Sequence, residues 1–377
     1  MSLGAEFGRI AMLSVHGCPL ATAGAGSAGG MNVYLKHLVQ GLDDRGFRVD
    51  LFTRTHGPCK GIVIEWGLQS RLIHLDAGPT MASKQDIFSY LPDFVAEMTR
   101  FMADGGISYD LIHSHYWFSG WVGRELASRL TIPHIVTFHT LAEFKQLAGG
   151  TDEPMERLET EADLIVGATS LVVFTNDEAR DLTQAFPSST DRIFAAPAGV
   201  DFDQFKDQDR TSTRAILGFA PEDKLLLYVG RLEVFKGPDI LLESLAVLRK
   251  MMDVKLIMVG GYGPTDPDVA RLVNLAERLK IRQAIYWRDA VPQDALGNYY
   301  NSADLLVMPS YHESFGLVAL EAMACGLPVA AYNVSGPKDV VGNTTGAVLA
   351  DDLGEACKEV KKLKSDDAIK HAKKYSW

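Results

Sequence analysis

Two cations in the second half of the chain have the spacing of a diphosphate-binding pair. Gly230-Arg231 follows an apolar run at 225–229, and Lys236-Gly237 precedes the next helical stretch. A guanidinium supplies a planar fork of donors and an ammonium a point charge, so Arg231 and Lys236 can converge on one diphosphate. An exposed basic loop is the plainer alternative, and the position of the pair at the end of a predicted strand makes it less favoured.

Two carboxylates, Glu313 and Glu321, flank the predicted start of a later helix. The segment Glu313-Ser-Phe-Gly-Leu-Val-Ala-Leu-Glu321 follows a strand predicted at 304–309, and we expect the helix to begin near Phe315. Glu313 would accept hydrogen bonds from sugar hydroxyls and Glu321 from a ribose, although Glu313 as a mere helix cap stays open. Free amides at a helix start bind phosphate. Here they belong to Phe315, Gly316, Leu317 and Val318.

Paired carboxylates also suggest a glycosidase. A retaining glycosidase holds its two carboxyl groups ~5–5.5 Å apart. Eight residues along a helix rise by ~12 Å, so this interpretation is excluded for Glu313 and Glu321.

The first half contains the glycine-rich run Gly24-Ala-Gly26-Ser-Ala-Gly29-Gly30-Met-Asn32. Its G-x-G-x-x-G spacing, with Asp50 about twenty residues later, is typical of a dinucleotide-binding turn. Residues 17–23 separate it from the preceding strand, however. We therefore expect a longer loop whose last amides, at Gly29 and Gly30, begin a helix near Asn32 and suit a phosphate. A plain flexible loop and, least favoured, a nicotinamide oxidoreductase remain as alternatives.

Three further groups of polar residues have weaker signals. His139 follows a strand predicted at 133–138 and would point into a cleft, although a structural hydrogen-bonding role is more common there. His113 and His115 stand two apart with no third ligand nearby, which is poor support for a metal. Asp201-x-Asp203 lies in a Pro/Gly-rich turn, and we interpret it as part of that turn rather than as a metal-binding motif.

Composition restricts the function classes. The chain has 377 residues and a net charge of −11, which argues against bulk binding of nucleic acid or a membrane surface. Residues 1–8 have no secretory pattern, no membrane span is predicted, and we expect a cytoplasmic protein. Cys18, Cys59, Cys325 and Cys357 form no C-x-x-C pair, so we expect neither a disulfide framework nor a zinc site.

Short apolar runs alternate with amphipathic stretches, which predicts parallel sheets with helices on both faces. Expected strands are 9–16, 47–54, 111–114, 133–138, 171–175, 224–229, 255–259, 284–287, 304–309 and 328–332. Expected helices are 32–45, 238–251, 268–279 and 317–325, with one lysine-rich helix exposing a solvated face at 355–374. The alternation of strands and helices begins again after a turn at 196–201. We predict two α/β, doubly wound, Rossmann-like domains, 1–197 and 198–377, facing across a cleft at the carboxyl ends of their strands.

These motifs resemble those of retaining glycosyltransferases with the two-domain GT-B fold, in family GT4. Glu313-x7-Glu321 and Gly230-Arg231…Lys236-Gly237 are marks of the whole family. Ser14-Val-His16, Gly29-Gly-Met-Asn-Val-Tyr34 and Asp110-Leu-Ile-His-Ser-His-Tyr-Trp-Phe-Ser-Gly120 are similar to the inositol-phosphate N-acetylglucosaminyltransferases of mycothiol biosynthesis. The likeness runs from about Arg9 to Val341.

The resemblance implies a role for each matching residue. Arg231 and Lys236 neutralise the departing diphosphate, Glu313 holds the sugar hydroxyls and Glu321 the ribose. Gly30 and Asn32 meet the diphosphate and acceptor region, and His139 lies beside the donor sugar. The positions that match the family's acceptor-phosphate cluster are Lys84, Tyr116, Thr140 and Arg157.

The resemblance further implies a UDP-sugar donor and a phosphorylated polyol or sugar acceptor. It implies no required cofactor, with Mg²⁺ at most stimulatory, no metal ligands and, as one assembly it allows, a homodimer. Sucrose-phosphate synthase activity and a binding-only module are the alternatives.

The sequence departs from the family at two places. It has Val334-Ser335-Gly336-Pro337 where two glycines are common, and it stops at Lys374-Tyr-Ser-Trp377, where relatives continue into a helix that crosses back. The first departure affects a loop expected to contact the base and the diphosphate. Because the missing helix would brace the first domain, we expect looser domain closure and weaker or absent turnover.

Overall fold

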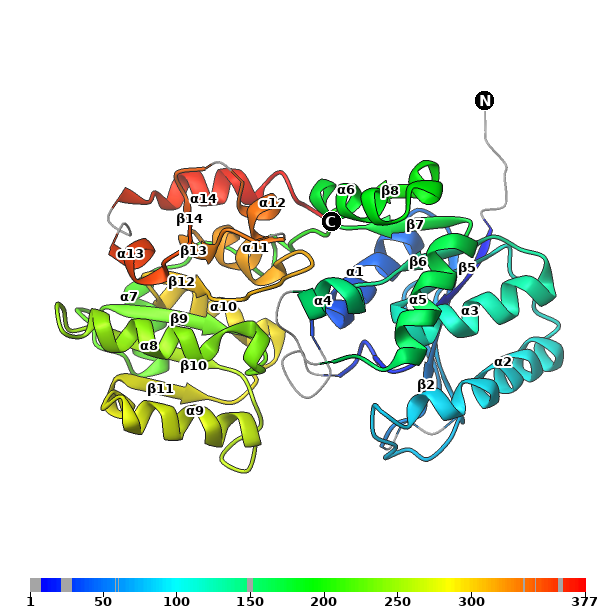
Figure 1. Cartoon of the computed structure of the whole chain (residues 1–377), viewed down its shortest axis with the longest axis horizontal. Helices are drawn as coiled ribbons and strands as arrows, with labels where there is room; N and C mark the ends of the chain where they lie inside the picture. The colour runs from blue at the N-terminus through cyan, green and yellow to red at the C-terminus, as the bar shows by residue number, and fades with distance from the viewer. Residues whose placement is uncertain are drawn as a thin grey trace.

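The computed structural model describes residues 8–21, 29–57, 59, 61–147, 152–334, 336–342, 344–358 and 362–377. These residues form two lobes, each built on its own sheet (Figure 1). Residues 196–224, which contain one helix, join the last strand of the first sheet to the first strand of the second.

The first lobe contains an eight-stranded sheet. Its strands are β1 (Arg9–Leu13), β2 (Arg48–Arg54), β3 (Val63–Glu65), β4 (Arg71–Leu75), β5 (Leu111–His115), β6 (His134–Thr137), β7 (Ser170–Val173) and β8 (Ile193–Ala195). They are ordered β3-β4-β2-β1-β5-β6-β7-β8, and only the β3–β4 pairing is antiparallel among these described strands. Because helices cover both faces, the central strands are buried and read as apolar runs.

The helices of the first lobe connect these strands. They are α1 (Gly30–Asp43), α2 (Leu91–Gly105), α3 (Tyr116–Leu130), α4 (Ala142–Leu147), α5 (Met155–Gly167) and α6 (Asn176–Ala185), with 3₁₀ turns η1 (Ile87–Tyr90) and η2 (Pro187–Arg192).

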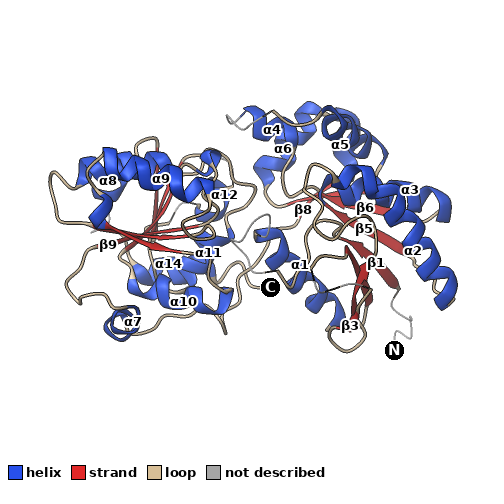
Figure 2. Ribbon diagram, turned by 90° about the horizontal axis from the view of Figure 1, so that it is seen from below, coloured by secondary structure: helices blue, strands red, loops and turns tan. Residues whose placement is uncertain are grey.

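The second lobe contains a six-stranded parallel sheet. Its strands are β9 (Leu225–Val229), β10 (Lys255–Val259), β11 (Ile285–Arg288), β12 (Leu305–Met308), β13 (Val329–Tyr332) and β14 (Ala347–Ala350), ordered β11-β10-β9-β12-β13-β14. Its helices are α7 (Arg210–Leu217), α8 (Pro238–Leu248), α9 (Pro267–Arg278), α10 (Gln293–Ser302), α11 (Leu317–Ala324), α12 (Pro337–Val341), α13 (Leu353–Lys358) and α14 (Ser365–Ala372), with η3 (Val234–Lys236) and η4 (Arg282–Ala284). Figure 2 shows α8 and α9 on one face of this sheet and α10 and α14 on the other.

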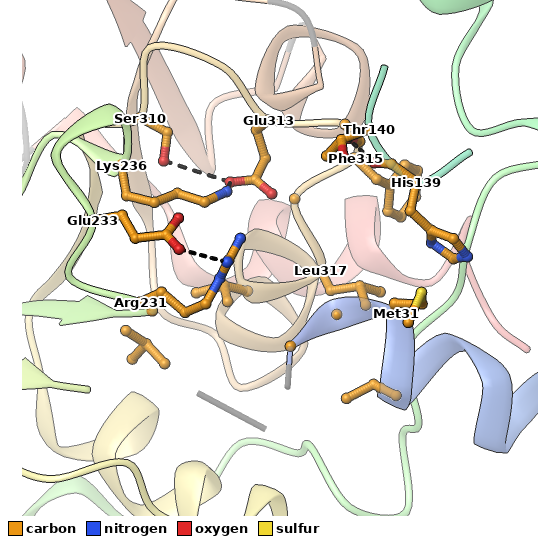
Figure 3. Close-up of a pocket in the computed structure, with 18 of the residues that line it drawn as sticks. Met31, His139, Thr140, Arg231, Glu233, Lys236, Ser310, Glu313, Phe315 and Leu317 are labelled. Carbon is orange, nitrogen blue, oxygen red and sulfur yellow. Dashed lines mark hydrogen bonds and ion pairs between the residues drawn. The ribbon is translucent and has the colours of Figure 1, made fainter. Parts of the chain in front are cut away.

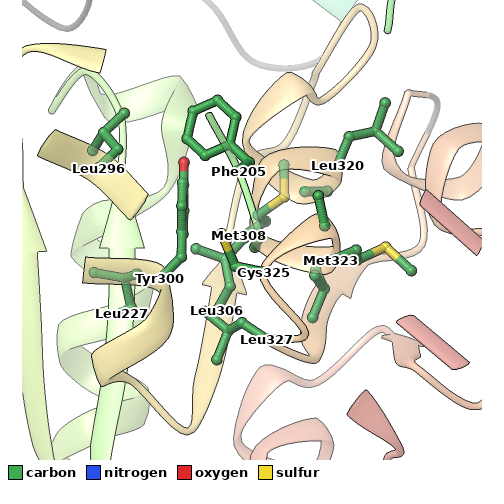
Figure 4. Packing of buried hydrophobic residues seen from close by; sticks show 14 of the residues in the cluster. Phe205, Leu227, Leu296, Tyr300, Leu306, Met308, Leu320, Met323, Cys325 and Leu327 are labelled. Carbon is green, nitrogen blue, oxygen red and sulfur yellow. The ribbon is translucent and has the colours of Figure 1, made fainter. Parts of the chain in front are cut away.

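The core of the second lobe supports the helix on which the expected donor site depends. Tyr300 of α10, Leu306 of β12 and Leu320 of α11 are all fully buried. Together with Phe205 from the connecting segment they form one apolar cluster (Figure 4). Because this cluster is continuous from the sheet to α11, the first turn of α11 is held rigidly at the sheet edge.

The predicted doubly wound α/β architecture is confirmed, and the differences from the sequence-based prediction are local. β3, β4, β8 and β14 had not been predicted. The segment 355–374, expected as the solvated face of one helix, contains the end of α13 and all of α14. α14 exposes Lys370 and buries Ala368 and Ala372 against α11. Both buried residues are small alanines, so the two helices can pack closely. The number of lysines in the segment gave no indication of this buried face.

The end of the chain returns to the first lobe. The backbone of Val200 bonds to that of Tyr375 at 2.8 Å, and the Trp377 ring stacks on His37 of α1 with centroids 4.8 Å apart. The sequence predicted that a helix crossing back to the first lobe is missing, yet the residues up to Trp377 contact that lobe.

Within the described part of the chain, no helix combines the length and apolar character needed to cross a membrane.

Candidate active site

A cavity of about 300 Å³ lies between the two lobes and is lined by residues of both. Many of the residues from the first lobe follow β1, β5 and β6 or begin α1, and many of those from the second follow β9 and β12. Each group stands at the carboxyl edge of its sheet, where α/β proteins bind ligands. Of the expected site residues, all but Asn32 line this cavity.

Lys236 and Glu313 form an ion pair in the second lobe (Figure 3). The Lys236 ammonium donates to Glu313 Oε2 at 2.6 Å, and Ser310 stands 3.5 Å from the same oxygen. Burial alone would raise the pKa of Glu313, but Lys236 outweighs it and holds the pKa below its ordinary value. Glu313 is therefore a charged acceptor at neutral pH.

A glycine brings Lys236 to this position. Gly237 has φ +71°, and any Cβ on it would overlap the carbonyl oxygen of Pro309 at the end of β12. Only glycine lets η3 approach β12 this closely. The short 3₁₀ turn thus carries Lys236 from the β9 loop onto the β12 loop that bears Glu313.

Arg231 faces the beginning of α1 across the cavity. Its guanidinium pairs with Glu233 at 2.9 Å, and a Cβ on Gly29 would lie 4.0 Å from Arg231 Nε. A Cβ on Gly30 would lie 3.4 Å from the Leu317 side chain, so the first turns of α1 and α11 meet at the same space. Two helix N-termini beside two cations make a positive environment suited to a diphosphate.

The helix after Glu313 begins where the expected helix at 317–325 begins. α11 starts at Leu317, after Gly316 with φ +103°, which is two residues beyond Phe315. Phe315 is buried against Phe174 of the first lobe. The first helical amides, which have no intrahelical acceptor, are those of Leu317 and Val318.

Glu321 lies on the second turn of α11 and is buried. Its carboxylate accepts from Tyr300 at 2.6 Å and from Gln293 at 3.0 Å. Burial raises the pKa of Glu321 to about 7. The two donors hold both oxygens at the cavity wall, and each oxygen keeps a second lone pair for a ligand hydroxyl.

His139 follows β6 in a left-handed conformation, with φ +62°. Its Nε2 lies 3.0 Å from His115 Nδ1, and its carbonyl oxygen accepts from the Ser314 hydroxyl of the second lobe. Burial lowers the pKa of His139 to about 3, so the ring is a neutral hydrogen-bonding group. The strained backbone is retained where both lobes contact it.

Lys84, Tyr116, Thr140 and Arg157 come together on the first-lobe side of the cavity, although they are spread over more than seventy positions. The Lys84 ammonium lies 4.8 Å from the centre of the Tyr116 ring, and the Arg157 guanidinium lies 4.9 Å from it. Two cations therefore lie against one aromatic ring.

Arg157 is largely committed to protein partners. Its guanidinium pairs with Glu161 at 2.7 Å and Glu153 at 2.9 Å, and donates to Thr140 O at 2.8 Å and Thr140 Oγ1 at 3.2 Å. These bonds account for four of its five N–H donors. Arg157 thus positions Thr140 and supplies charge, whereas the Lys84 ammonium has no hydrogen-bond partner among the described residues.

The structure does not bring Asn32 to the cavity. Its side chain is buried, accepts from the Gly29 amide at 3.0 Å and donates to the Cys18 carbonyl at 2.6 Å. The expected contact with an acceptor is replaced by capping of α1, because both ends of the amide are used. Gly24 and Gly26 lie outside the described residues.

Asp50 does not form a ligand site with the glycine-rich run. It is buried in β2, where it pairs with Arg9 at 2.8 Å and Arg71 at 2.7 Å and accepts from Tyr109. Asp50 is therefore not available as the ribose-binding acidic residue that a dinucleotide-binding motif requires. Asp201 accepts from the Asp203 amide at 2.9 Å, in the turn that the sequence predicted.

Several cavity residues were missing from the predicted site. His16 is the most informative: its ring lies 4.4 Å from the Tyr116 ring, and its buried Nδ1 has no partner among the described residues. His16 stands just beyond β1, the same signal that pointed to His139. Glu233, Gln293 and Ser314 act through Arg231, Glu321 and His139, and no local pattern marks them.

Comparison with known proteins finds matches along almost the whole chain. Residues 28–204 match the family described as Glycosyltransferase Family 4, and residues 209–376 match Glycosyl transferases group 1. The D-inositol 3-phosphate glycosyltransferase of Corynebacterium jeikeium (strain K411) is 37% identical over 391 residues, covering 98% of this chain and 93% of that protein. The chain belongs to the family 4 glycosyltransferases.

Other relatives agree on fold and activity class. The D-inositol 3-phosphate glycosyltransferase of Geodermatophilus obscurus is 38% identical and covers 98% of this chain and 86% of its own length. Sucrose-phosphate synthase from Thermosynechococcus elongatus superposes with a TM-score of 0.90 at 30% identity, covering 98% of this chain and 95% of the other. Anabaena HepE, at 18% identity and a TM-score of 0.74, shares the fold, with 98% of this chain and 95% of HepE covered. The predicted GT-B architecture and glycosyltransferase activity are confirmed.

Proposed function

We propose that this family 4 glycosyltransferase moves N-acetylglucosamine from a UDP-linked donor to inositol phosphate, with retention of configuration at the anomeric carbon. The observation that carries the proposal is the placement of Lys84, Tyr116, Thr140 and Arg157 opposite Arg231, Lys236 and Glu313 in one cavity. The names of the relatives, D-inositol 3-phosphate glycosyltransferase, support the acceptor class. The HepE structure, which contains UDP and glucose, supports the donor class.

The donor would bind mainly to the second lobe. Arg231 and Lys236 would contact the diphosphate, together with the first amides of α11 and α1. Glu313 would accept from sugar hydroxyls, and Glu321 from the ribose. Both cations are already paired with carboxylates. The diphosphate would therefore bind beside existing ion pairs and not to unpaired cations.

The acceptor would bind to the first lobe through its phosphate. Lys84 can donate three hydrogen bonds, and the Thr140 hydroxyl is positioned by Arg157. The neutral rings of His16 and His139 border the space between this cluster and the donor sugar. An acceptor hydroxyl placed there can reach the anomeric carbon.

Catalysis would be mainly electrostatic. As the acceptor oxygen bonds to the anomeric carbon, the bond from that carbon to the diphosphate breaks and negative charge develops on the leaving group. Arg231 and Lys236 are fixed where that charge appears. We expect turnover without added metal and at most a stimulation by Mg²⁺.

A panel of substrates tests the proposal. UDP-N-acetylglucosamine and UDP-glucose are each combined with inositol phosphate, inositol or fructose 6-phosphate, and release of UDP is measured. We expect the fastest release with UDP-N-acetylglucosamine and inositol phosphate, and little with unphosphorylated inositol. Equal rates with inositol and inositol phosphate would overturn the assigned acceptor class.

Sucrose-phosphate synthase activity is the second candidate, favoured by the TM-score of 0.90 to that enzyme. Faster UDP release from UDP-glucose with fructose 6-phosphate would select it. Tight UDP binding without transfer or donor hydrolysis would instead indicate a binding-only protein.

A further inference from the structure

Cys18, His56 and His74 form a cluster of possible metal ligands outside the active-site cavity. Their ligand atoms all lie within 4.8 Å of one another. Cys18 follows β1, His56 follows β2 and His74 lies on β4, so three neighbouring strands bring them together. The sequence had argued against zinc because its cysteines form no C-x-x-C pair. That argument fails here, because the ligands are adjacent in the sheet but distant along the chain.

The distances suit zinc. Cys18 Sγ lies 3.5 Å from His74 Nε2. Tetrahedral zinc, with Zn–S and Zn–N bonds of ~2.3 and ~2.05 Å, places a sulfur and a nitrogen ligand ~3.5 Å apart. His56 is within 4.8 Å of both, so a small side-chain rotation completes three ligands.

The hydrogen bonds leave the ring nitrogens available. His74 Nδ1 lies 3.2 Å from the Ile62 carbonyl oxygen, which can only accept, so Nδ1 carries the proton and Nε2 presents its lone pair to Cys18. Metal-bound histidines usually have such a backbone partner on the other nitrogen. His56 Nε2 is buried and has no partner among the described residues.

From this geometry we propose that Cys18, His56 and His74 bind a zinc ion. Cys59, three residues after His56, or a water would occupy the fourth position. Cys18 and His74 are buried and His56 is half-buried, so the ion would enter from the His56 side. Binding would displace the Cys18 thiol proton to solvent and form a Zn–S bond without any redox change.

The site is joined to the active-site cavity through one turn. The Cys18 carbonyl accepts from Asn32 at 2.6 Å, and Asn32 caps the beginning of α1 beside Gly29 and Gly30. A metal on Cys18 would stabilise that turn, which makes its role structural.

Cobalt binding by the full chain tests the proposal. The protein is stripped of metal with a chelator and loaded with Zn²⁺ or Co²⁺, and bound metal is measured by mass spectrometry. We expect one ion per chain and, with Co²⁺, a thiolate-to-cobalt charge-transfer band. Cys18→Ser should abolish the band, and His56→Gln should weaken affinity at least ~100-fold. Cys357→Ala, which changes a buried cysteine in the other lobe, should leave both unchanged.

Circular dichroism and UDP binding show whether each variant is folded. Because His56 is half-buried in a loop, His56→Gln keeps the test valid even if Cys18→Ser unfolds. No retained ion in the folded wild-type chain, a charge-transfer band that survives in Cys18→Ser, or a Cys18–Cys59 disulfide in freshly purified protein would overturn the proposal.

Discussion

At the residue scale, the central feature is the ion pair of Lys236 with the half-buried Glu313. Replacing Lys236 with Ala removes the charge that stabilises the leaving group, and we expect kcat to fall by ~10²–10³. UDP release under saturating substrates measures this. Lys250→Ala, an exposed lysine after α8, is the matched control and should be neutral. Near-normal turnover by the Lys236→Ala enzyme would contradict the assignment.

The raised pKa of Glu321 predicts that the stability of the protein depends on pH. Burial raises its pKa to about 7, above the ordinary ~4.3, so the folded chain binds more protons than the unfolded chain between these values. Its contribution to the free energy of unfolding therefore falls as pH rises through that window, by at most ~3–4 kcal/mol. Urea unfolding at pH 5 and pH 8 should show a larger loss for wild type than for Glu321→Gln.

The comparison between the two proteins isolates Glu321 from other groups. Glu178, whose pKa burial also raises to about 7, and the buried histidines contribute equally to both. An identical pH dependence in wild type and variant would show that the carboxyl group titrates normally.

At the element scale, the loop between β12 and α11 depends on one glycine from elsewhere in the lobe. Gly336 has φ +89°, and a Cβ on it would overlap the carbonyl oxygen of Glu313. Gly336→Ala should therefore displace Glu313 and lower kcat/KM by about tenfold or more, since small misplacements of catalytic groups are costly. Steady-state kinetics with varied donor measures the effect.

Gly218→Ala provides a control for the backbone strain. Gly218 also has positive φ, +77°, but a Cβ there meets no described atom within 4 Å. The backbone strain alone should cost each variant ~1–2 kcal/mol of stability, and the overlap with Glu313 should add to the loss in Gly336→Ala. If both also lost activity equally, displacement of Glu313 would not be the cause.

The elements themselves were predictable to different degrees. The buried central strands and the amphipathic helices followed from apolar runs and helical spacing. β3 and β8 have three residues each and exposed side chains, so no periodicity marks them. β4 was missed because His74 interrupts its apolar run, and His74 is buried only because Cys18 and the Ile62 carbonyl face it.

At the scale of the whole molecule, side-chain contacts join the two lobes at several points. Ser314 bonds to the carbonyl of His139, Phe315 packs on Phe174, and Trp377 stacks on His37. Domain closure sets the activity of many enzymes whose sites are shared between domains. We expect these contacts to determine how often the two halves of the site meet.

Trp377→Ala tests that expectation. Losing an aromatic contact of ~0.5–1.5 kcal/mol should lower kcat/KM for transfer up to about tenfold. UDP affinity should change little, because the proposed UDP contacts lie mainly in the second lobe. Kinetics, UDP titration and the radius of gyration from solution scattering measure the three effects. Trp66→Ala, a half-buried tryptophan packed only within the first lobe, should leave transfer unchanged.

Sequence alone determined the α/β class, the family and the residues that carry charge, because apolar periodicity and short motifs are local properties. Arg231, Lys236, Glu313 and Glu321 could be named from their spacing to strand and helix ends. Tertiary structure alone decided which partners the polar side chains have. Asn32 caps a helix, Arg157 is paired with two carboxylates, and Cys18 lies beside two histidines. A parallel sheet places the ends of distant strands side by side, and contacts made across its edge leave no periodic trace in the chain.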